Sequence, residues 1–462
     1  MVNSPLCDPN HNNGLSGYCP AYTYIPNIES PVHGILDPYF DIANTYGFAN
    51  WMWQTNQGPS FPAHQFLFSG TSAPAAFSQT DTYYKWFVAE NPSWPGHANQ
   101  AGDSTGCSAA STAYARIIDT NASEGTCPLV GDNMYCAYPC YFHPTLATDV
   151  LETNGLSWRY YARDQGSLWT APNSFQTICG PPYSGSCNLQ EWTDHVGSYL
   201  PIPNPIEAAP ILRDIERCDQ DFPAVAWVIP DGYWSDHPGY DPLKHPGTHD
   251  GGPSWVAHIV NAVGNHTCSP GNTHDVAKWT NTVILIVWDD WGGFYDHVSP
   301  DISAGGPGIG YPDGNGGPYV HGFRVPLLVV SAYGTPHYIS GPTSNPQCVS
   351  PNSSPYCHDF GSILNFIEFT FGTGGTPLNE VDAQYNYPYA DHWAPDAVPY
   401  CVSRTACPYS LSDFFADFDQ AQPFTPITSW KYPETCFHNP DQSGCFPGYK
   451  PEDADDDADD TQ

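Results

Sequence analysis

The sequence is short of basic residues. It holds 12 Lys and Arg against 48 Asp and Glu, so the formal net charge at pH 7 is −36. Such a charge repels phosphate backbones and acidic lipid surfaces, which makes nucleic acid and anionic membranes poor partners. Scarce cations also fit a protein that works in acid, where protonation of its carboxylates relieves their mutual repulsion.

Long hydrophobic runs are missing as well. The chain contains no run of 18 apolar residues, so the sequence predicts no transmembrane segment. Charged residues make up 13% of the chain, against roughly 25% in ordinary soluble proteins. Proline (49), glycine (41) and aromatic residues (15%) take their place. This composition predicts long, ordered, turn-rich loops.

The start of the chain lacks the features of a signal peptide. Residues 1–15 contain neither a basic stretch nor an apolar core. The sixteen cysteines are nevertheless typical of an exported protein, and none shows the paired spacing of a zinc site. We therefore expect a secreted or periplasmic protein whose natural start lies upstream of Met1. Reduced structural thiols are the alternative to disulfides.

Cysteines that are close in the sequence are the first candidates for disulfide pairs. The favoured bridges are Cys348/Cys357, Cys401/Cys407 and Cys436/Cys445, and the further near neighbours are Cys136/Cys140 and Cys179/Cys187.

The stretch from Thr282 to Val298, TVILIVWDDWGGFYDHV, dominates the interpretation. Its apolar run is too short for a typical helix and predicts a strand buried on both faces. Asp289 and Asp290 follow at the end where ligands bind in open α/β sheets. Gly292 and Gly293 permit the chain to break there, so both carboxylates can converge on one hard divalent cation. A solvated acidic turn is the alternative interpretation.

Predicted strands and helices alternate along the chain. Strands are expected at 157–162, 223–230, 283–288 and 325–331, and helices at 39–50, 145–154, 206–218, 253–263 and 360–371. This alternation favours an α/β fold with a mostly parallel central sheet, helices on both faces and long disulfide-rich loops. The acidic tail at 452–460 is expected to be disordered.

Ser60 has two interpretations. Pro62 suits the first turn of a helix, and Ser60 just before it suits the helix cap. Alternatively, Ser60 is a nucleophile at a helix N-terminus, where N–H groups and the helix dipole stabilise an anionic phosphoryl group. His64 would then lie one turn on, on the same face. His237 follows the predicted strand 223–230, although a lone loop histidine is usually just exposed.

Several separated motifs carry a resemblance to a known family. They are VWDDWGGFYDHV, HGFRVPLLVVSAYG, HDFGSILNFIEFTFG, GPSFPAHQFLFSGT, TDVLETNGLSWRYY and PAVAWVIPDGYWSDHPG. In their order along the chain, these motifs resemble the bacterial phosphoesterase family of phospholipases C and acid phosphatases, within the alkaline phosphatase superfamily. The resemblance implies a phosphoesterase domain over residues 1–433, followed by a cysteine-containing extension with the acidic tail over 434–462. The Asp-Asp pair looks closer to the acid phosphatase branch.

The resemblance also implies a chemistry and its residues. Ser60 would be nucleophile and metal ligand, and Asp289 and Asp290 would bind the same divalent metal, calcium or another hard cation. His237 would contact the phosphate or act as general acid, and His297 would be a further site residue. A phosphoserine intermediate would form and be hydrolysed. The substrate would be a phosphate-ester small molecule or a phospholipid head group.

One departure from the family pattern stands out. The family opens with an apolar strand ending in a Glu-Asn pair that supplies two more metal ligands, and no such segment precedes Ser60. We therefore expect an N-terminally incomplete domain with unpaired backbone groups on the strands that should flank the missing one. The alternative function is a non-catalytic exported binding protein that retains the fold with a degraded metal site.

Overall fold

A computed structural model describes much of the chain. The described residues are 33–56, 58–74, 86–92, 105–110, 113, 115, 117–119, 124–125, 140–203, 206–220, 222–236, 251–268, 278–291, 296, 298, 321–341, 357–371, 378, 389–394, 396, 409–415 and 420–446. The acidic tail lies outside them, so its predicted disorder stays a prediction.

Helical structure occurs in each predicted helical range, but residues 47–49 of the range 39–50 and residues 206–207 of the range 206–218 are strands instead. The helices are α1 (Asp37–Thr45), α2 (Ser60–Ser69), α3 (Gln190–His195), α4 (Pro210–Glu216), α5 (Gly252–Asn265), α6 (Lys278–Asn281), α7 (Phe360–Thr370), α9 (Ala390–Trp393) and α10 (Thr435–His438). The helix expected at 145–154 is a π-helix followed by a 3-10 turn. It ends at Gly155, whose φ of 70° is the left-handed cap that glycine favours.

The predicted strands are also present. The strands are β1 (Gly47–Ala49), β2 (Met52–Trp53), β3 (Trp86–Val88), β4 (Ile117–Asp119), β5 (Glu124–Gly125), β6 (Trp158–Tyr161), β7 (Ile202–Pro203), β8 (Ile206–Glu207), β9 (Val225–Val228), β10 (Val283–Val287), β11 (Leu327–Ser331), β12 (Tyr338–Ser340) and β13 (His358–Asp359).

The sheets are small and of mixed direction. The largest among the described residues has the order β10-β11-β1-β12. In it β11 runs antiparallel to both β10 and β1, while β1 and β12 are parallel. Separate parallel pairs join β6 to β9 and β13 to β2. The expected mostly parallel central sheet is therefore not found. An apolar run indicates burial on both faces but not strand direction, so the sequence could not reveal that β11 turns back against β10.

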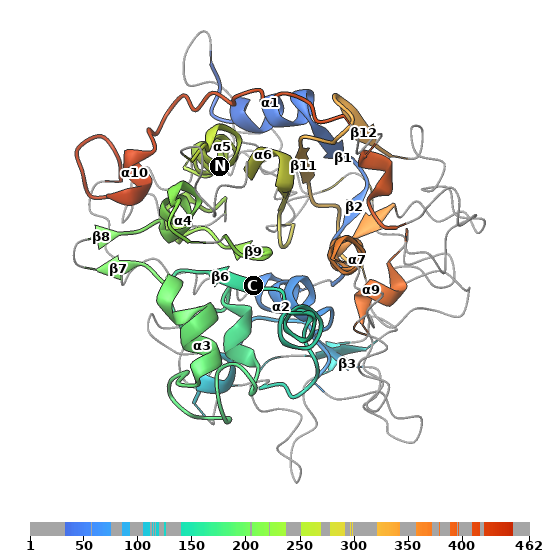
Figure 1. The fold of residues 1–462 in the computed structure, drawn as a ribbon. Coiled ribbons are helices and arrows are strands. Elements are labelled where there is room, and N and C mark those ends of the chain that lie inside the picture. Colours follow the sequence, from blue (N-terminus) through green and yellow to red (C-terminus); the bar gives the residue numbers. More distant parts are fainter. Residues whose placement is uncertain are drawn as a thin grey trace, which may run out of the picture.

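Helices cover both faces of the largest sheet, as expected. Successive side chains of a strand point to opposite faces, and β11 separates its contacts in this way. Leu327 and Val329 belong to a core with residues of α2 and α7, whereas Leu328 and Val330 belong to a core with residues of α1 and α5. Figure 1 shows α1 and α5 on one side of β11 and β1, with α2 and α7 on the other.

β9 and β10 lie in different sheets but run in the same direction. Near their starts, the Lys278 ammonium group lies 5.8 Å from the centre of the Phe222 ring. Beyond their ends, the side chain of Trp288 hydrogen-bonds to Asp236. Because the starts and the ends each meet, the carboxyl ends of both strands lie at one edge of the fold.

All cysteines within the described residues are disulfide-bonded. Two bridges confirm predicted neighbours: Cys179–Cys187 and Cys436–Cys445. Of the other predicted pairs, Cys357 is bonded, whereas Cys348, Cys401 and Cys407 lie outside the described residues.

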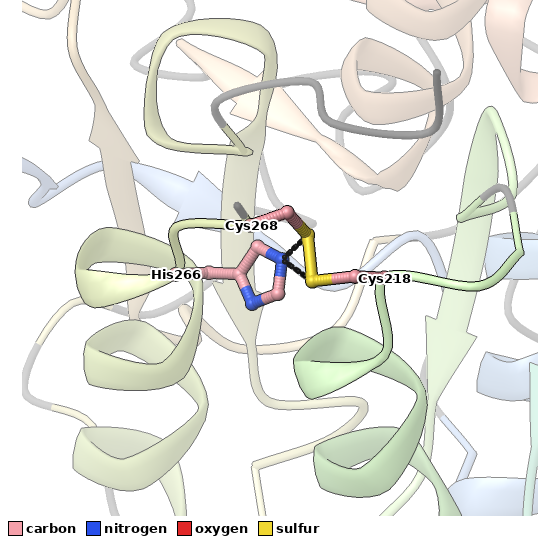
Figure 2. A group of neighbouring side chains, drawn as sticks. All are labelled: Cys218, His266 and Cys268. Carbon is pink, nitrogen blue, oxygen red and sulfur yellow. Dashed lines mark hydrogen bonds between the residues drawn. A yellow bond between two sulfur atoms is a disulfide. The ribbon is translucent and has the colours of Figure 1, made fainter. Parts of the chain in front are cut away.

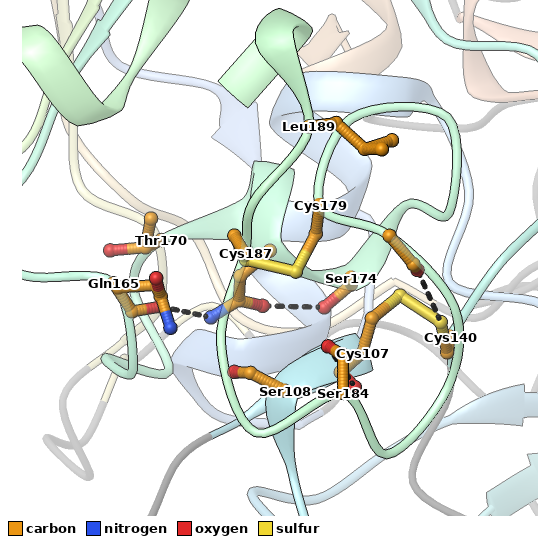
Figure 3. The surroundings of a disulfide bond; sticks show 12 residues. Cys107, Ser108, Cys140, Gln165, Thr170, Ser174, Cys179, Ser184, Cys187 and Leu189 are labelled. Atoms are coloured by element: carbon orange, nitrogen blue, oxygen red, sulfur yellow. Dashed lines mark hydrogen bonds between the residues drawn. A yellow bond between two sulfur atoms is a disulfide. The ribbon is translucent and has the colours of Figure 1, made fainter. Parts of the chain in front are cut away.

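Two bridges join cysteines that are far apart in the sequence. Cys140 pairs with Cys107, 33 residues away, so the predicted neighbour pair Cys136/Cys140 is wrong. Figure 3 shows this bridge near Cys179–Cys187, and the Ser184 N–H donates to the Cys107 carbonyl at 3.1 Å. The second, Cys218–Cys268, joins the segments that follow α4 and α5. Bridges of such length fit an oxidising compartment.

The C-terminal segment packs onto the α4–α5 side of the fold. Phe437 of α10 and Phe446 both contact Trp234, with ring centres 5.4 Å apart in each pair. Phe437 also lies 5.3 Å from the ring of Trp255 in α5. All four rings are buried. Part of the predicted extension at 434–462 thus shares a core with the preceding chain.

Each arginine in the described part of the chain pairs with an aspartate. The pairs are Arg159–Asp214, Arg163–Asp231, Arg213–Asp214, Arg217–Asp219 and Arg324–Asp296. Arg163 and Asp231 follow the adjacent strands β6 and β9 and are buried together. Removing one member of such a buried pair would leave an uncompensated charge.

A buried polar cluster surrounds His358 beneath β12. Its Nδ1 lies 2.8 Å from Asp396 Oδ2, and its Nε2 lies 2.8 Å from Ser340 Oγ and 3.6 Å from Asp413 Oδ2. Burial opposes the charged imidazole, but the carboxylates of Asp413 and Asp396 outweigh it and raise the pKa of His358 to about 10. The imidazolium is therefore part of the folded state at neutral pH.

This cluster predicts a pH-dependent stability. A histidine pKa raised by folding adds stability that is complete below its unfolded value of about 6.5 and is lost as the pH rises through about 10. We expect His358→Gln to lower the free energy of unfolding at pH 6 by about 3 kcal/mol. The variant should also lose less stability than the wild type between pH 6.5 and 10. Urea denaturation at several pH values measures the loss of stability at pH 6 and its change with pH. The control is His438→Gln, because the His438 side chain is partly exposed. Parallel curves of stability against pH for His358→Gln and the wild type would contradict the raised pKa of His358.

Candidate active site

The start of α2 and the end of β10 meet at one cavity of about 770 Å³, here called the central cavity. Ser60, Asp289 and Asp290 all line it, so the structure brings together the three predicted metal ligands. His237 and His297 lie outside the described residues. Their roles therefore stay predictions.

Ser60 is the first residue of α2, and its hydroxyl points to the acidic pair. Its Oγ donates to Asp290 Oδ2 at 3.1 Å. The N-cap residue of the helix is Pro59, whose own side chain makes no capping hydrogen bond. The interpretation of Ser60 as an ordinary cap is therefore wrong.

The N-terminus of α2 offers few free N–H groups for an anion. The Phe61 N–H donates to Asn91 Oδ1 at 2.9 Å, and Pro62 has no N–H to give. The Ala63 N–H reaches back to the Pro59 carbonyl at 3.4 Å. Positive charge for a phosphoryl group at Ser60 must therefore come mainly from elsewhere.

The loop before Ser60 is held by close backbone contact. The Gly58 carbonyl accepts hydrogen bonds from Gln54 Nε2 at 2.5 Å and Asn56 Nδ2 at 3.0 Å. A side chain at position 58 would overlap the Ala89 carbonyl. Glycine is thus required at position 58, where this loop passes the end of β3. This close contact between Gly58 and Ala89 fixes the position at which α2 begins.

His64 lies one helical turn after Ser60 and faces the same cavity, as predicted. Its Nε2 lies 3.1 Å from Asp289 Oδ2, and its Nδ1 lies 3.3 Å from the Tyr160 hydroxyl. That hydroxyl donates its only hydrogen to the Trp169 carbonyl at 2.6 Å. It therefore presents lone pairs to His64 Nδ1, while Asp289 presents a carboxylate oxygen to Nε2.

Tyr160 is a neutral hydroxyl in this arrangement. Burial raises its pKa far above the usual value, and the Asp289 charge raises it further. The side chain is fully buried, so it can fix the orientation of the His64 ring. Sequence reasoning placed His64 correctly but gave no sign of Tyr160, because its position in strand β6 is ordinary for a core residue.

A third carboxyl group, that of Asp236, lines the central cavity beyond the end of β9. Burial raises the pKa of Asp236 to about 6, against the lowering effect of hydrogen bonds from Tyr39 and Trp288. The Tyr39 hydroxyl donates to its Oδ2 at 2.7 Å. Asp236 directly precedes His237 in the chain, so this network fixes the start of the segment that carries the predicted histidine.

An arginine holds the chain next to the other predicted histidine. Arg324 donates to both carboxylate oxygens of Asp296, each at 2.8 Å. A third hydrogen bond joins Arg324 to the Asn50 carbonyl at 3.1 Å. Bidentate pairs of this kind fix geometry as well as charge. The residue immediately before His297 is thus tied to the body of the protein.

Comparison with known proteins identifies the family. A sequence profile of the phosphoesterase family matches residues 35–374, most of the chain. The chain belongs to the phosphoesterase family. The match includes Ser60, Asp289 and Asp290, so the residues gathered at the central cavity are part of the family's own region.

Curated relatives of this phosphoesterase are phospholipases C. "Phospholipase C B" of Mycobacterium tuberculosis is 29% identical over 227 residues, covering 47% of this chain and 39% of the relative. "Non-hemolytic phospholipase C" of Burkholderia pseudomallei is 25% identical over 358 residues, covering 72% and 43%. "Non-specific phospholipase C6" of Arabidopsis thaliana is 31% identical over 147 residues, covering 29% and 25%. The chain thus spans well under two thirds of the length of these relatives.

The acidic pair of the phosphoesterase fits part of a metal site. Ser60, Asp289 and Asp290 offer hard oxygen donors on one cavity, and Ser60 is already within 3.1 Å of Asp290. These donors suit calcium or another hard cation in kind. These three residues are fewer than the six or more oxygen ligands that calcium usually takes.

Other groups of possible ligands lie away from the central cavity. Figure 2 shows His266 beside the Cys218–Cys268 bridge, with Nε2 3.0 Å from the Cys268 sulfur. Metal binding by cysteine requires thiolates, and a disulfide offers none. The remaining groups in the described chain are Glu152/Glu191/His195 and Glu216/Glu434/His438. None of these residues lines the central cavity.

The geometry at Ser60 predicts how little its hydroxyl adds to stability. Because it caps no helix, Ser60→Ala should change the free energy of unfolding by less than about 0.5 kcal/mol. Thr145 is a true cap whose hydroxyl accepts from the Thr148 N–H at 3.1 Å, so Thr145→Ala should cost about 1 kcal/mol. Urea denaturation of the two variants compares them directly. An equal or larger loss for Ser60→Ala would restore the capping interpretation.

Proposed function

We propose that this chain hydrolyses phosphate esters with Ser60 as the nucleophile. The observation that carries the proposal is the hydrogen bond from Ser60 Oγ to Asp290 Oδ2, both of which line the cavity that His64 and Asp289 also line. A serine hydroxyl directed at a carboxylate is poised to lose its proton as it attacks. Membership of the phosphoesterase family supports phosphorus as the target.

The chemistry of the first step follows from these contacts. The Ser60 oxygen forms a bond to phosphorus, its proton passes to the Asp290 carboxylate, and the bond from phosphorus to the leaving alcohol breaks. Water then attacks the phosphorus bound to Ser60, which restores the Ser60 hydroxyl and frees phosphate from a monoester substrate or a phosphomonoester from a diester. His237 remains the candidate acid for the leaving group, and His297 remains a candidate site residue.

Charge balance explains the roles of the remaining groups. Two adjacent carboxylates and an anionic ester repel one another. His64 Nε2 lies 3.1 Å from Asp289 Oδ2, so a proton on this nitrogen would be shared with that carboxylate. A divalent cation held by Ser60, Asp289 and Asp290 would supply the further positive charge that neutralises the phosphoryl oxygens and favours the ionised serine.

The substrate class and compartment belong to the same proposal. The relatives bear phospholipase C names, which supports a phosphate-ester small molecule or a phospholipid head group as substrate. The disulfides support a secreted or periplasmic protein. No described helix has both the length and the hydropathy to cross a membrane.

Hydrolysis of p-nitrophenyl phosphate and p-nitrophenyl phosphorylcholine, with and without added divalent metal, tests the proposal. Ser60→Ala should lower turnover by about 10³-fold or more. Ser69→Ala provides a matched control, because Ser69 is a buried serine on the same helix whose hydroxyl donates to the Gln65 carbonyl at 2.9 Å. Labelled substrate should mark a peptide that contains Ser60. Label on another residue would refute the nucleophile, and inertness of the wild type towards both esters would favour a non-catalytic binding protein.

Asp290→Asn tests the carboxylate separately. The amide keeps the shape but cannot take the Ser60 proton and carries no charge for a cation, so turnover and metal affinity should fall together. Metal stoichiometry by titration calorimetry and ester hydrolysis are the measurements. Asp219→Asn, at an exposed side chain paired with Arg217, is the control. Unchanged metal binding in Asp290→Asn would remove Asp290 from the metal site.

A further inference from the structure

Three side chains that can bind a metal lie together at the start of β6. Glu152 begins a 3-10 turn that precedes β6, and Glu191 and His195 belong to α3. β6 runs parallel to β9, whose carboxyl end lies at the edge that carries the candidate active site. The group therefore lies at the opposite end of the strand, and none of its residues lines the central cavity.

The imidazole ring of His195 is held in one orientation by Trp158. Its Nδ1 lies 2.8 Å from the Trp158 carbonyl oxygen. Because a carbonyl oxygen only accepts, Nδ1 carries the hydrogen, and in the neutral ring the lone pair is on Nε2. The ring also stacks on the Trp158 side chain, with centres 4.4 Å apart and planes inclined by 6°. Metal-bound histidines commonly donate their other N–H to a backbone carbonyl in this way.

The lone pair of His195 faces two carboxylates. Nε2 lies 3.2 Å from Glu152 Oε1 and 3.4 Å from Glu191 Oε1. Glu191 and His195 are four residues apart, so both lie on one face of α3. The indole N–H of the buried Trp158 donates to Glu152 Oε1 at 2.6 Å, which fixes this carboxylate as well. One nitrogen and two oxygens thus meet in a small volume.

The spacing of these atoms suits zinc. Zinc binds imidazole nitrogen and carboxylate oxygen at about 2.0–2.2 Å in a tetrahedron, whose edges then measure about 3.3–3.6 Å. The distances from Nε2 to the two oxygens are close to this edge. Calcium and magnesium prefer oxygen ligands alone, so the imidazole disfavours them. The three side chains are 21–31% exposed, which leaves the fourth position open to water.

The protein alone does not satisfy the acidic pair. Glu191 Oε1 is buried and has no hydrogen-bond partner among the described residues. Burial, and then the neighbouring Glu152, raises the pKa of Glu191 to about 8, as expected where carboxylates crowd together without a cation. A charged imidazole would offset one of the two carboxylate charges, whereas a divalent ion offsets both.

We propose that Glu152, Glu191 and His195 form a zinc site with three protein ligands and one water. The ion would join α3 to the turn before β6 and hold both against Trp158. An open fourth position is typical of sites that exchange ligands, so the ion would bind reversibly and stabilise the folded chain by mass action. The inference does not depend on the catalytic role of Ser60.

Zinc titration calorimetry tests the site. The parent chain carries Asp290→Asn, which removes a carboxylate proposed for the metal at the central cavity. Because a ligand contributes more than a residue behind it, Glu191→Gln and His195→Gln should each weaken zinc binding by about 100-fold or more. In the chain that retains Asp290, the same two variants should each lose one equivalent of bound zinc.

Two matched variants control for charge and for residue type. Asp194→Asn removes the same charge as Glu191→Gln from the same helix, but the Asp194 carboxylate accepts from Gln190 Nε2 instead. His438→Gln alters the similar group Glu216/Glu434/His438, where the histidine nitrogen is 3.8 Å from the nearer Glu434 oxygen. Each control should change zinc affinity by less than about threefold.

Diethyl pyrocarbonate gives a readout specific to the residue, because it modifies a free imidazole nitrogen. Zinc should prevent its reaction at His195 and leave its reaction at His438 unchanged, as measured by mass spectrometry of the peptides. Zinc should also raise the unfolding temperature of the parent chain, and this rise should be lost in Glu191→Gln.

The outcomes separate ligation from a general effect of charge. Loss of zinc binding in Glu191→Gln and His195→Gln, with binding retained in both controls, supports the site. An equal loss in Asp194→Asn overturns it, since charge alone would then explain the result. Unchanged binding in both ligand variants, or no zinc binding by the parent chain, also overturns it and leaves an ion-pair cluster. None of these readouts uses ester hydrolysis, so failure here is distinct from failure of the proposed function.

Discussion

Two contacts between the start of α2 and the end of β10 hold the candidate site together. Ser60 reaches Asp290, and His64 one turn later reaches Asp289. The residues in each pair are more than 220 positions apart in the sequence, so the site exists only when the α2 layer packs on the sheet. The Asn91 bond to the Phe61 N–H and the close approach at Gly58 both serve this placement. The geometry of the site thus depends directly on how helix α2 packs on the sheet.

Much of this arrangement could be predicted from local pattern. The apolar run at 283–288 could satisfy its backbone and side chains only as a buried strand, and the glycines after Asp290 indicated where it would end. The four-residue spacing of Ser60 and His64 fixed their common face once a helix was assumed. The near-neighbour bridges at Cys179 and Cys436 followed from short loop closure. These features depend on residues close together in the chain.

Features that depend on distant residues were the ones missed. β11 runs antiparallel to β10, but its apolar sequence suits either direction. Cys140 has a near neighbour at Cys136, yet tertiary packing brings it to Cys107. Tyr160 meets His64 only because β6 packs beneath α2. Pairing across the fold is decided by three-dimensional packing, which short sequence windows do not record.

The arginine–aspartate pairs have a consequence for proteolysis after basic residues. Proteases of the trypsin type cut after lysine or arginine and must draw that side chain into a deep acidic pocket. In the described part of this chain each arginine is engaged by an aspartate, and Arg163 is also buried. Only 12 of the 462 residues are basic, so the chain has few possible cleavage sites. At several of these sites an arginine–aspartate ion pair must break before the side chain can enter the protease. The acidic composition thus leaves this class of protease few basic residues to recognise in the folded protein.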